Sequence, residues 1–135
     1  PERGKIDHNS YNKDNETNYI NYNHAKINKE LFDFYKNMIK LRKEIKSFQF
    51  CYDDDIEFFE TGDEFSLAFL VRENSDYYFV VLNSNSNKKS NIENPLGRKM
   101  QILISTNKEE LTKEINEKDT ITIEELTGKI YKITN

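Results

Sequence analysis

The sequence predicts an α+β chain in which a loop and one long helix precede an antiparallel all-β sandwich. Three observations lead to this prediction. Before about residue 24 the sequence has no sustained period, from Ile27 to Ser47 apolar residues recur every three or four positions, and from Tyr52 onward they recur mostly every second position. The change of period marks a change of architecture near residue 50. We therefore expect two regions, residues 1–50 and residues 51–135.

The composition limits the partners that the chain can have. Its 135 residues amount to about one domain, and nine Phe and eight Tyr can supply a core although only 36% of the residues are hydrophobic. The net charge is −4 with both signs interspersed, so no basic stripe could neutralise phosphates. No apolar run approaches the roughly 20 residues that span a bilayer. We expect neither a nucleic-acid nor a membrane partner.

The start of the chain has no charged-then-apolar signal peptide, and its first residue is Pro1 rather than Met. We interpret the chain as a fragment or a processed product, which is compatible with either a cytoplasmic or a secreted bacterial parent protein. Its single cysteine, Cys51, excludes an internal disulfide and a cysteine-built metal site.

The first element is a loop rich in Asn and Tyr. Composition alone favours a disordered tract. However, Asp7, Asn9, Ser10 and Tyr11 come close together. Asp, Asn and Ser side chains can hydrogen-bond sugar hydroxyls, and a Tyr ring can lie against a pyranose face. These four residues are the candidate binding residues of the chain.

The second element is a helix over about 27–47. Asn28 is a plausible N-cap, Glu30 lies in the first turn and basic residues gather toward the end, in agreement with the helix dipole. One face is predicted to consist of Leu31, Phe34, Tyr35, Met38, Leu41, Arg42 and Ile45. A single helix before a sandwich would bury this face poorly. We expect the helix to be the last element of a larger body.

The third element is a series of strands. The segments "IEFFE", "FSLAFLVRE", "DYYFVVLN", "RKMQILIS", "TITIEE" and "KIYKITN" are typical of short strands, and the dividers "TGDE" and "NSD" are short enough for hairpins. Such a series without long helices between its strands predicts an antiparallel sandwich. The tract from Asn83 to Asn94 is predicted to be a long solvated hairpin loop, and "KEELTKEI" either a solvated loop or one helical turn.

The remaining polar clusters predict no chemistry. The run Asp53 to Asp55 lacks the glycine and the ligand spacing of a calcium loop, so we interpret it as a solvated linker. No local motif pairs the cysteine with either histidine, and the four glycines form no phosphate loop. We expect no catalytic residue, no metal and no cofactor in this chain.

Two motifs follow one another in the first part of the chain. The first is "RGKIDHNSYN", with Arg3, Lys5 and the Asn-Ser-Tyr-Asn run 9–12, and the second is the helix "LFDFYKNMIKLRKEIKSF". In this order they resemble the end of the catalytic domain of type I pullulanases, which are starch-debranching enzymes of the α-amylase superfamily (glycoside hydrolase family 13). The helix motif is shared across the superfamily, whereas Asn-Ser-Tyr-Asn in this setting is typical of pullulanases. Where the family has Pro-Asp-Ser-Val-Asn-like residues next, this chain has "KDNETN".

The resemblance implies a function for the parent protein. Residues 1–50 would be the loop after strand 8 and helix 8 of a (β/α)₈ barrel, and residues 51–135 its C-terminal sandwich. The parent would hydrolyse α-1,6-glucosidic bonds in pullulan, starch or glycogen, with Asp7, Asn9, Ser10 and Tyr11 shaping the cleft for the α-glucan substrate. The catalytic carboxylates lie on earlier barrel strands in this family, so the chain alone would be inactive and its partner would be the missing barrel.

Two alternatives stay open at this stage. A non-catalytic carbohydrate-binding module would expose a row of aromatic rings on one sheet face, from among Tyr77, Tyr78, Phe79 and Tyr131. An unrelated α+β interaction protein would instead pack the helix on the sandwich.

Overall fold

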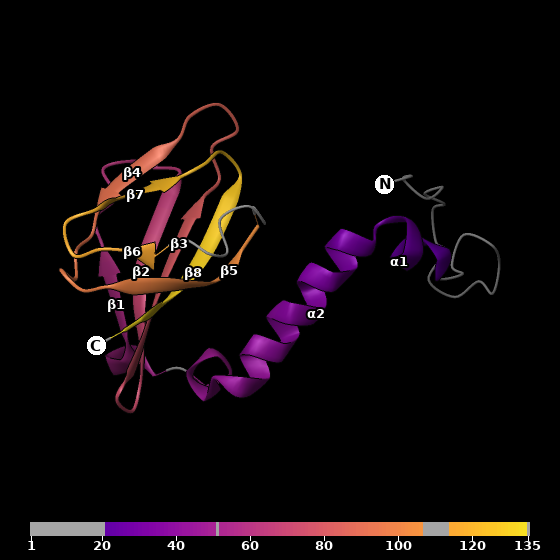
Figure 1. The fold of residues 1–135 in the computed structure, drawn as a ribbon, viewed down its shortest axis with the longest axis horizontal. Coiled ribbons are helices and arrows are strands. Elements are labelled where there is room, and N and C mark those ends of the chain that lie inside the picture. The colour runs from indigo at the N-terminus through magenta and orange to yellow at the C-terminus, as the bar shows by residue number, and fades with distance from the viewer. Residues whose placement is uncertain (1–20, 51, 107–113, 135) are drawn as a thin grey trace. The chain divides into compact units, whose positions relative to one another are not determined.

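The computed structural model describes residues 21–50, 52–106 and 114–134 (Figure 1). These residues fall into two compact units that divide between Ile39 and Lys40. The first unit holds the helical start of the described chain, and the second holds the end of the long helix and all the strands.

Two helices replace the single predicted one. The short helix α1 spans Asn23–Ile27, and the long helix α2 spans Lys29–Glu44. Asn28 separates them with φ −103° and ψ 44°, and its side-chain amide donates to the carbonyl of His24 at 3.2 Å. This side chain, predicted to be the N-cap of the long helix, therefore bonds to the end of α1. The helix stops at Glu44 because Ile45 is extended.

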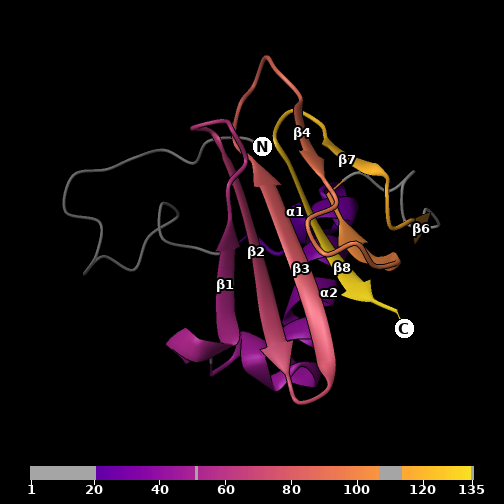
Figure 2. The same ribbon diagram turned by 90° about the vertical axis from the view of Figure 1, so that its left-hand side faces the viewer.

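The described residues of the second unit form eight strands in two sheets (Figures 1 and 2). The six-stranded sheet has the order β1-β2-β3-β8-β5-β6, and the two-stranded sheet pairs β4 with β7. All pairs are antiparallel. The strands are β1 Ile56–Phe59, β2 Ser66–Glu73, β3 Asp76–Asn83, β4 Ser90–Glu93, β5 Met100–Ser105, β6 Glu114–Ile115, β7 Thr120–Ile123 and β8 Thr127–Ile133.

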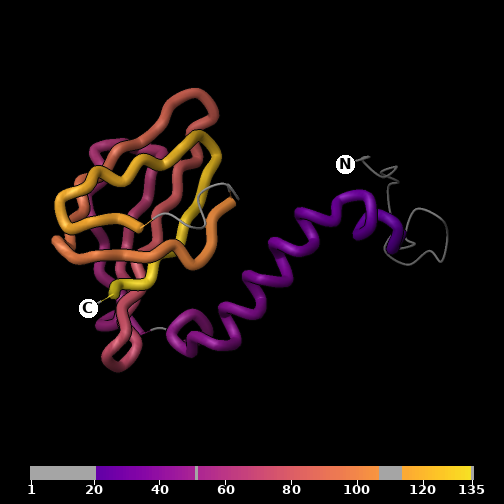
Figure 3. Tube along the Cα trace, viewed as in Figure 1, coloured from indigo at the N-terminus to yellow at the C-terminus, as the bar shows by residue number. Residues whose placement is uncertain are grey.

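The chain passes from the large sheet to the small sheet and back twice, at β4 and at β7, as the trace in Figure 3 shows. Two 3-10 turns, Lys46–Phe48 and Asp53–Asp55, connect α2 to β1. The second of them is the predicted linker. The antiparallel all-β sandwich predicted for the second region is thus confirmed, whereas the barrel origin of the region before it stays a prediction.

The core lies between the two sheets. Alternate residues of the large sheet point toward the small sheet, and Phe79 and Tyr131 oppose each other in the register of β3 and β8 with ring centroids 6.5 Å apart. Both rings are almost fully buried, as are Ile121 and Ile123 of β7. The complete core cluster is Ala68, Leu70, Phe79, Val81, Ile92, Met100, Ile102, Ile115, Ile121, Ile123, Tyr131 and Ile133.

The structure corrects the prediction of one long solvated loop after β3. Ser90–Glu93 forms β4, in which Ser90 and Ile92 are buried while the two residues between and after them are exposed. Asn83, at the start of the predicted loop, is itself buried. The sequence does not predict this strand because only one of its four side chains is apolar. In "KEELTKEI" the last two residues form β6, and the residues before them lie outside the described part of the chain.

The turn between β7 and β8 contains an unusual backbone conformation. Leu126 has φ 51°, in the left-handed region that leucine rarely adopts, and its side chain is 66% exposed. Its backbone N–H donates to the carbonyl of Asn85 at 3.0 Å, which connects this turn to the loop after β3.

Candidate functional site

The four predicted cleft residues, Asp7, Asn9, Ser10 and Tyr11, lie outside the described residues. Their role as cleft residues therefore stays a prediction. Elsewhere in the described chain, no group of His, Cys, Asp and Glu side chains has the arrangement of a metal site. No helix among the described residues is long and apolar enough to cross a membrane.

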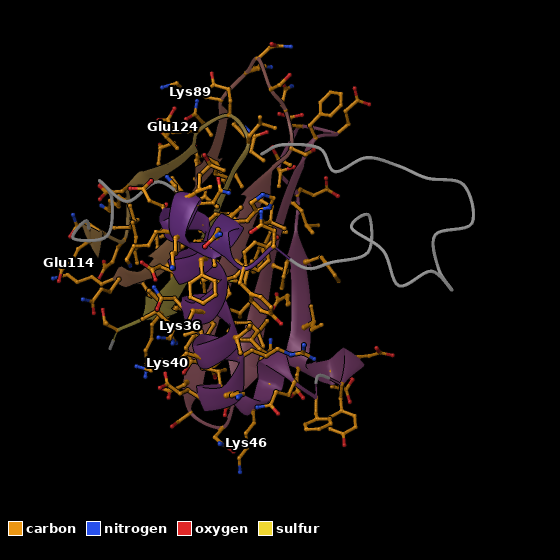
Figure 4. The ribbon with its side chains drawn as sticks, turned by 90° about the vertical axis from the view of Figure 1, so that its right-hand side faces the viewer. Lys36, Lys40, Lys46, Lys89, Glu114 and Glu124 are labelled. Atoms are coloured by element: carbon orange, nitrogen blue, oxygen red, sulfur yellow. The ribbon has the colours of Figure 1, made fainter. Side chains whose placement is uncertain are left out.

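The most distinctive surface of the first part of the chain is the apolar side of α2. Not one residue of this helix is buried. Leu31 and Tyr35, one turn apart, are 55% and 61% exposed. Lys36 and Lys40 also lie one turn apart, in a separate row (Figure 4). The predicted apolar face therefore forms, but no described part of the chain buries Leu31 and Tyr35 on it.

A second apolar surface lies on the outer face of the large sheet, opposite the sandwich core. The register pairs Phe58 with Phe69 and Leu67 with Leu82 on this face. The two phenylalanine rings lie at 47° to each other with centroids 5.7 Å apart, and Phe58 is 66% exposed. We call these four residues the outer apolar patch. An exposed patch of this kind marks an interaction surface more often than a scatter of single apolar residues does.

The sequence contained a signal for this outer patch. Strict alternation predicts a sheet with one solvated face, whereas β2 and β3 contain the continuous apolar runs "LAFLV" and "YYFVVL". Continuous runs are typical of strands that are covered on both faces. The continuous runs therefore indicate that both faces of β2 and β3 are apolar. A pattern of period two alone does not predict the apolar outer face.

Next to this patch the outer face becomes polar around Tyr78. Lys132 Nζ is 3.1 Å from Asp76 Oδ1 and 5.8 Å from the centre of the Tyr78 ring. Burial raises the pKa of the Tyr78 hydroxyl, and this effect exceeds the opposing effect of the Lys132 charge. The hydrogen bond to Asp76 raises the pKa of Lys132. Both groups therefore hold their protons more firmly than they would in water.

The four aromatic residues that could have formed a sugar platform do not form an exposed row. Phe79 and Tyr131 belong to the core, and Tyr78 is 6% exposed. Tyr77 is half-buried, with the guanidinium of Arg98 5.8 Å from its ring centre. The feature expected of a carbohydrate-binding module is therefore absent from these four positions.

Comparison with solved structures shows that this fold is similar to part of the fold of trehalulose and isomaltulose synthases. Neither a family model nor a curated protein matches the chain by sequence. Among solved structures, trehalulose synthase MutB from Pseudomonas mesoacidophila MX-45 matches 85% of this chain with a TM-score of 0.62 and 18% identity. Isomaltulose synthase SmuA from Protaminobacter rubrum matches 87% with a TM-score of 0.65 and 17% identity.

A third structure gives the same result. A variant of isomaltulose synthase from Erwinia rhapontici NX5, solved with its natural substrate sucrose, matches 86% of this chain with a TM-score of 0.64 and 17% identity. This chain spans about a fifth of the length of each of the three enzymes: 21%, 22% and 21%. At such identities the likeness establishes the fold. It does not show which family the chain belongs to, so the pullulanase relation stays a prediction.

Proposed function

We propose that this chain is the C-terminal part of an α-amylase-family enzyme that cleaves glucosidic bonds, and that the parent is of the pullulanase type. The observation that carries the proposal is the extent of the structural likeness. The strands from Ile56 to Ile133 with their loops make up less than two thirds of the chain, but the likeness to the sucrose-converting enzymes covers 85% to 87% of it. The likeness therefore includes residues that precede the sandwich.

The pullulanase type rests on the sequence motifs. The run Asn-Ser-Tyr-Asn at 9–12 precedes the helix that carries Leu-Arg-Lys at 41–43, in the order that the resemblance to pullulanases implies. In a (β/α)₈ barrel such a loop lies at the C-terminal face, where substrates bind. Asp7, Asn9, Ser10 and Tyr11 would then contact glucose units of a branched α-glucan through hydroxyl hydrogen bonds and ring stacking.

The chemical step would belong to the barrel. Retaining glycosidases hold two carboxylates about 5 Å apart across the scissile bond, one as nucleophile and the other as acid and base. The resemblance assigns neither carboxylate to this chain. The chain alone would therefore have no hydrolase activity, and its contribution would be one wall of the cleft and a stabilising domain.

The partner in this proposal is the barrel of the same protein. The apolar side of α2 and the outer apolar patch are both exposed, although Leu31, Tyr35, Phe58 and Leu67 are residues that stable proteins bury together. A barrel would cover the helix as its eighth helix and would give the patch a packing surface. Burial of each such side chain is worth about 1.5–3 kcal/mol.

A second candidate function follows from the structural neighbours. The enzymes matched are trehalulose and isomaltulose synthases, and one of them is described with sucrose as its natural substrate. A parent enzyme that rearranges sucrose would use the same fold. The two candidates differ in whether the cleft accepts a long branched α-glucan or a disaccharide.

The experiment is an assay of the complete parent enzyme with pullulan and with sucrose. The debranching proposal expects reducing ends from pullulan and no isomer of sucrose. Replacing Asn9 (Asn9→Ala) should lower kcat/KM for pullulan by about tenfold, since a lost hydrogen bond to substrate is worth about 1 kcal/mol or somewhat more. Asn87→Ala, in the loop after β3, serves as the matched control and should leave kcat/KM unchanged.

The outcomes separate the candidates. Turnover of sucrose without turnover of pullulan would contradict the debranching function and support the sucrose-converting one. Turnover of neither sugar would contradict both candidate functions. Unchanged kinetics of Asn9→Ala in an active debranching enzyme would remove the role assigned to the loop while leaving the function intact.

The alternative of a carbohydrate-binding module has a direct test on the 135-residue chain. Calorimetric titration with maltooligosaccharides should give no binding heat if the chain is part of a larger enzyme. Saturable heat would favour a binding role in spite of the buried rings of Phe79 and Tyr131.

A further inference from the structure

The segment that joins α2 to the sandwich is held on the sandwich at several points. We call residues 45–49 the junction segment. Ile45 is 6% exposed, and Ser47 Oγ donates to a main-chain carbonyl of β2 at 2.9 Å. The ring of Phe48 packs on that of Tyr78 with centroids 5.7 Å apart. The junction segment is therefore packed against the strands and is not a free linker.

The carboxylate of Glu73 binds the start of this segment. Glu73 is the last residue of β2, and its two oxygens accept hydrogen bonds from the backbone N–H groups of Lys46 at 3.0 Å and Ser47 at 3.5 Å. Lys46 is labelled in Figure 4. The first N–H groups of a helical turn have no partner within the turn, so a carboxylate there makes charge-assisted hydrogen bonds.

The other end of the junction segment binds back to the helix. The side-chain amide of Gln49 donates to the carbonyl oxygens of Arg42 at 2.8 Å and Lys43 at 3.2 Å. These carbonyls belong to the last turn of α2, where helical carbonyls lack a partner within the helix. One short segment thus donates hydrogen bonds in two directions, to the helix end through the Gln49 side chain and to the sandwich through its backbone N–H groups.

We propose that Glu73 and Gln49 form a latch that makes the last turn of α2 open and close together with the sandwich. Glu73 fixes the junction segment to the β2–β3 hairpin, and Gln49 fixes the end of the helix to the junction segment. The division of the chain within α2, between Ile39 and Lys40, agrees with this coupling because it groups the last turn with the strands. The latch requires no sugar and no barrel, so it stands independently of the proposed function.

Amide hydrogen exchange of the 135-residue chain, resolved by residue, tests the latch. In Glu73→Gln the charge and one acceptor oxygen are lost while the size is kept. The amides of Lys46 and Ser47, and with them that of Ile45, which closes the last turn of α2, should exchange roughly 10- to 100-fold faster. Glu93→Gln, at an exposed position of β4, is the matched control and should change none of these rates.

Three readouts decide the result. The amides of Phe79 and Tyr131 report whether the sandwich remains folded and should be unchanged. Faster exchange of Lys46 and Ser47 with an unchanged rate at Ile45 would overturn the coupling, and unchanged rates at all three would overturn the latch. If Glu73→Gln does not fold, Gln49→Ala decides alone: it should accelerate exchange at Ile45 by about tenfold, and an unchanged rate there would contradict the proposal.

Discussion

Asn83 connects the loop that follows it with the end of β7, which lies 40 positions further along the chain. Its buried side-chain amide donates to the carbonyl oxygens of Lys88 at 2.9 Å, Ile123 at 3.2 Å and Glu124 at 3.2 Å. Its oxygen accepts the N–H of Asn85 at 2.9 Å. One residue at the end of β3 thus fixes the loop after it and the end of β7. Lys89 and Glu124, which form an ion pair at 2.5 Å, lie at the same place (Figure 4).

Replacement of Asn83 by Ala should therefore destabilise the sandwich more than an average substitution. Carbonyls that are shielded from water would lose their donor, and an unsatisfied buried polar group costs about 1–3 kcal/mol. We expect the free energy of unfolding, measured by urea titration, to fall by about 2–3 kcal/mol. Asn87→Ala, in the exposed part of the same loop, should change it by less than about 0.5 kcal/mol. A fall no larger than that of the control would contradict the assigned role.

At the scale of single elements, α2 differs from every central strand because it has no buried residue. Its residues are good helix formers with opposite charges one turn apart, such as Lys40 and Glu44 at 3.7 Å. Local preferences can therefore form the helix, but they do not explain why one side of it is apolar. An apolar side on a helix is maintained by a surface that covers it.

Substitutions on the apolar side of α2 should thus affect stability differently in the 135-residue chain and in the proposed parent enzyme. In the 135-residue chain, Leu31→Ser should leave the thermal midpoint of the sandwich nearly unchanged because Leu31 is exposed. In the complete parent the same change should cost about 1.5–3 kcal/mol, the value of a fully buried leucine. Lys36→Ser, on the same helix, should have little effect in either protein. Equal small effects of Leu31→Ser in both proteins would show that no barrel covers this side.

At the scale of the whole molecule, the helices and strands whose apolar residues recur at regular spacing could be predicted from the sequence. The helix around Phe34 and the strands from Ile56, Ser66, Asp76, Met100, Thr120 and Thr127 all have a repeated apolar pattern. β4 and β6 lack it because Ser90–Glu93 has one apolar side chain and β6 has only two residues. Such strands form because neighbouring strands supply their hydrogen bonds, which a local pattern does not contain.

The candidate site was predictable to a smaller extent. The helix face was recognised from its spacing, but the outer apolar patch was not, since it arises only when the register places Phe58 beside Phe69 and Leu67 beside Leu82. The latch between Glu73 and the junction segment joins residues 26 and 27 positions apart. Contacts of that separation depend on the tertiary fold.

The stability of the whole sandwich should fall in alkaline solution. The pKa of Tyr78 is raised by burial and that of Lys132 by its hydrogen bond to Asp76, so the folded state binds protons more firmly than the unfolded state. The stabilisation is complete below the ordinary pKa values, near 10, and is lost as the pH rises through the raised values. Urea titration should show a lower free energy of unfolding at about pH 11 than at about pH 8.

Tyr78→Phe should make this decline smaller because it removes one of the two groups. Tyr52→Phe, at a 76% exposed position, serves as the control and should keep the full decline. An unchanged pH profile in Tyr78→Phe would show that Tyr78 does not contribute to it.

The left-handed backbone at Leu126 has a practical consequence for anyone who engineers this domain. A branched side chain in this region costs about 1–2 kcal/mol relative to a residue that adopts it readily, and here the side chain is exposed and outside the core cluster. Asparagine tolerates the conformation far better. The turn between β7 and β8 is thus a position where the domain can be made more robust without any redesign of its interior.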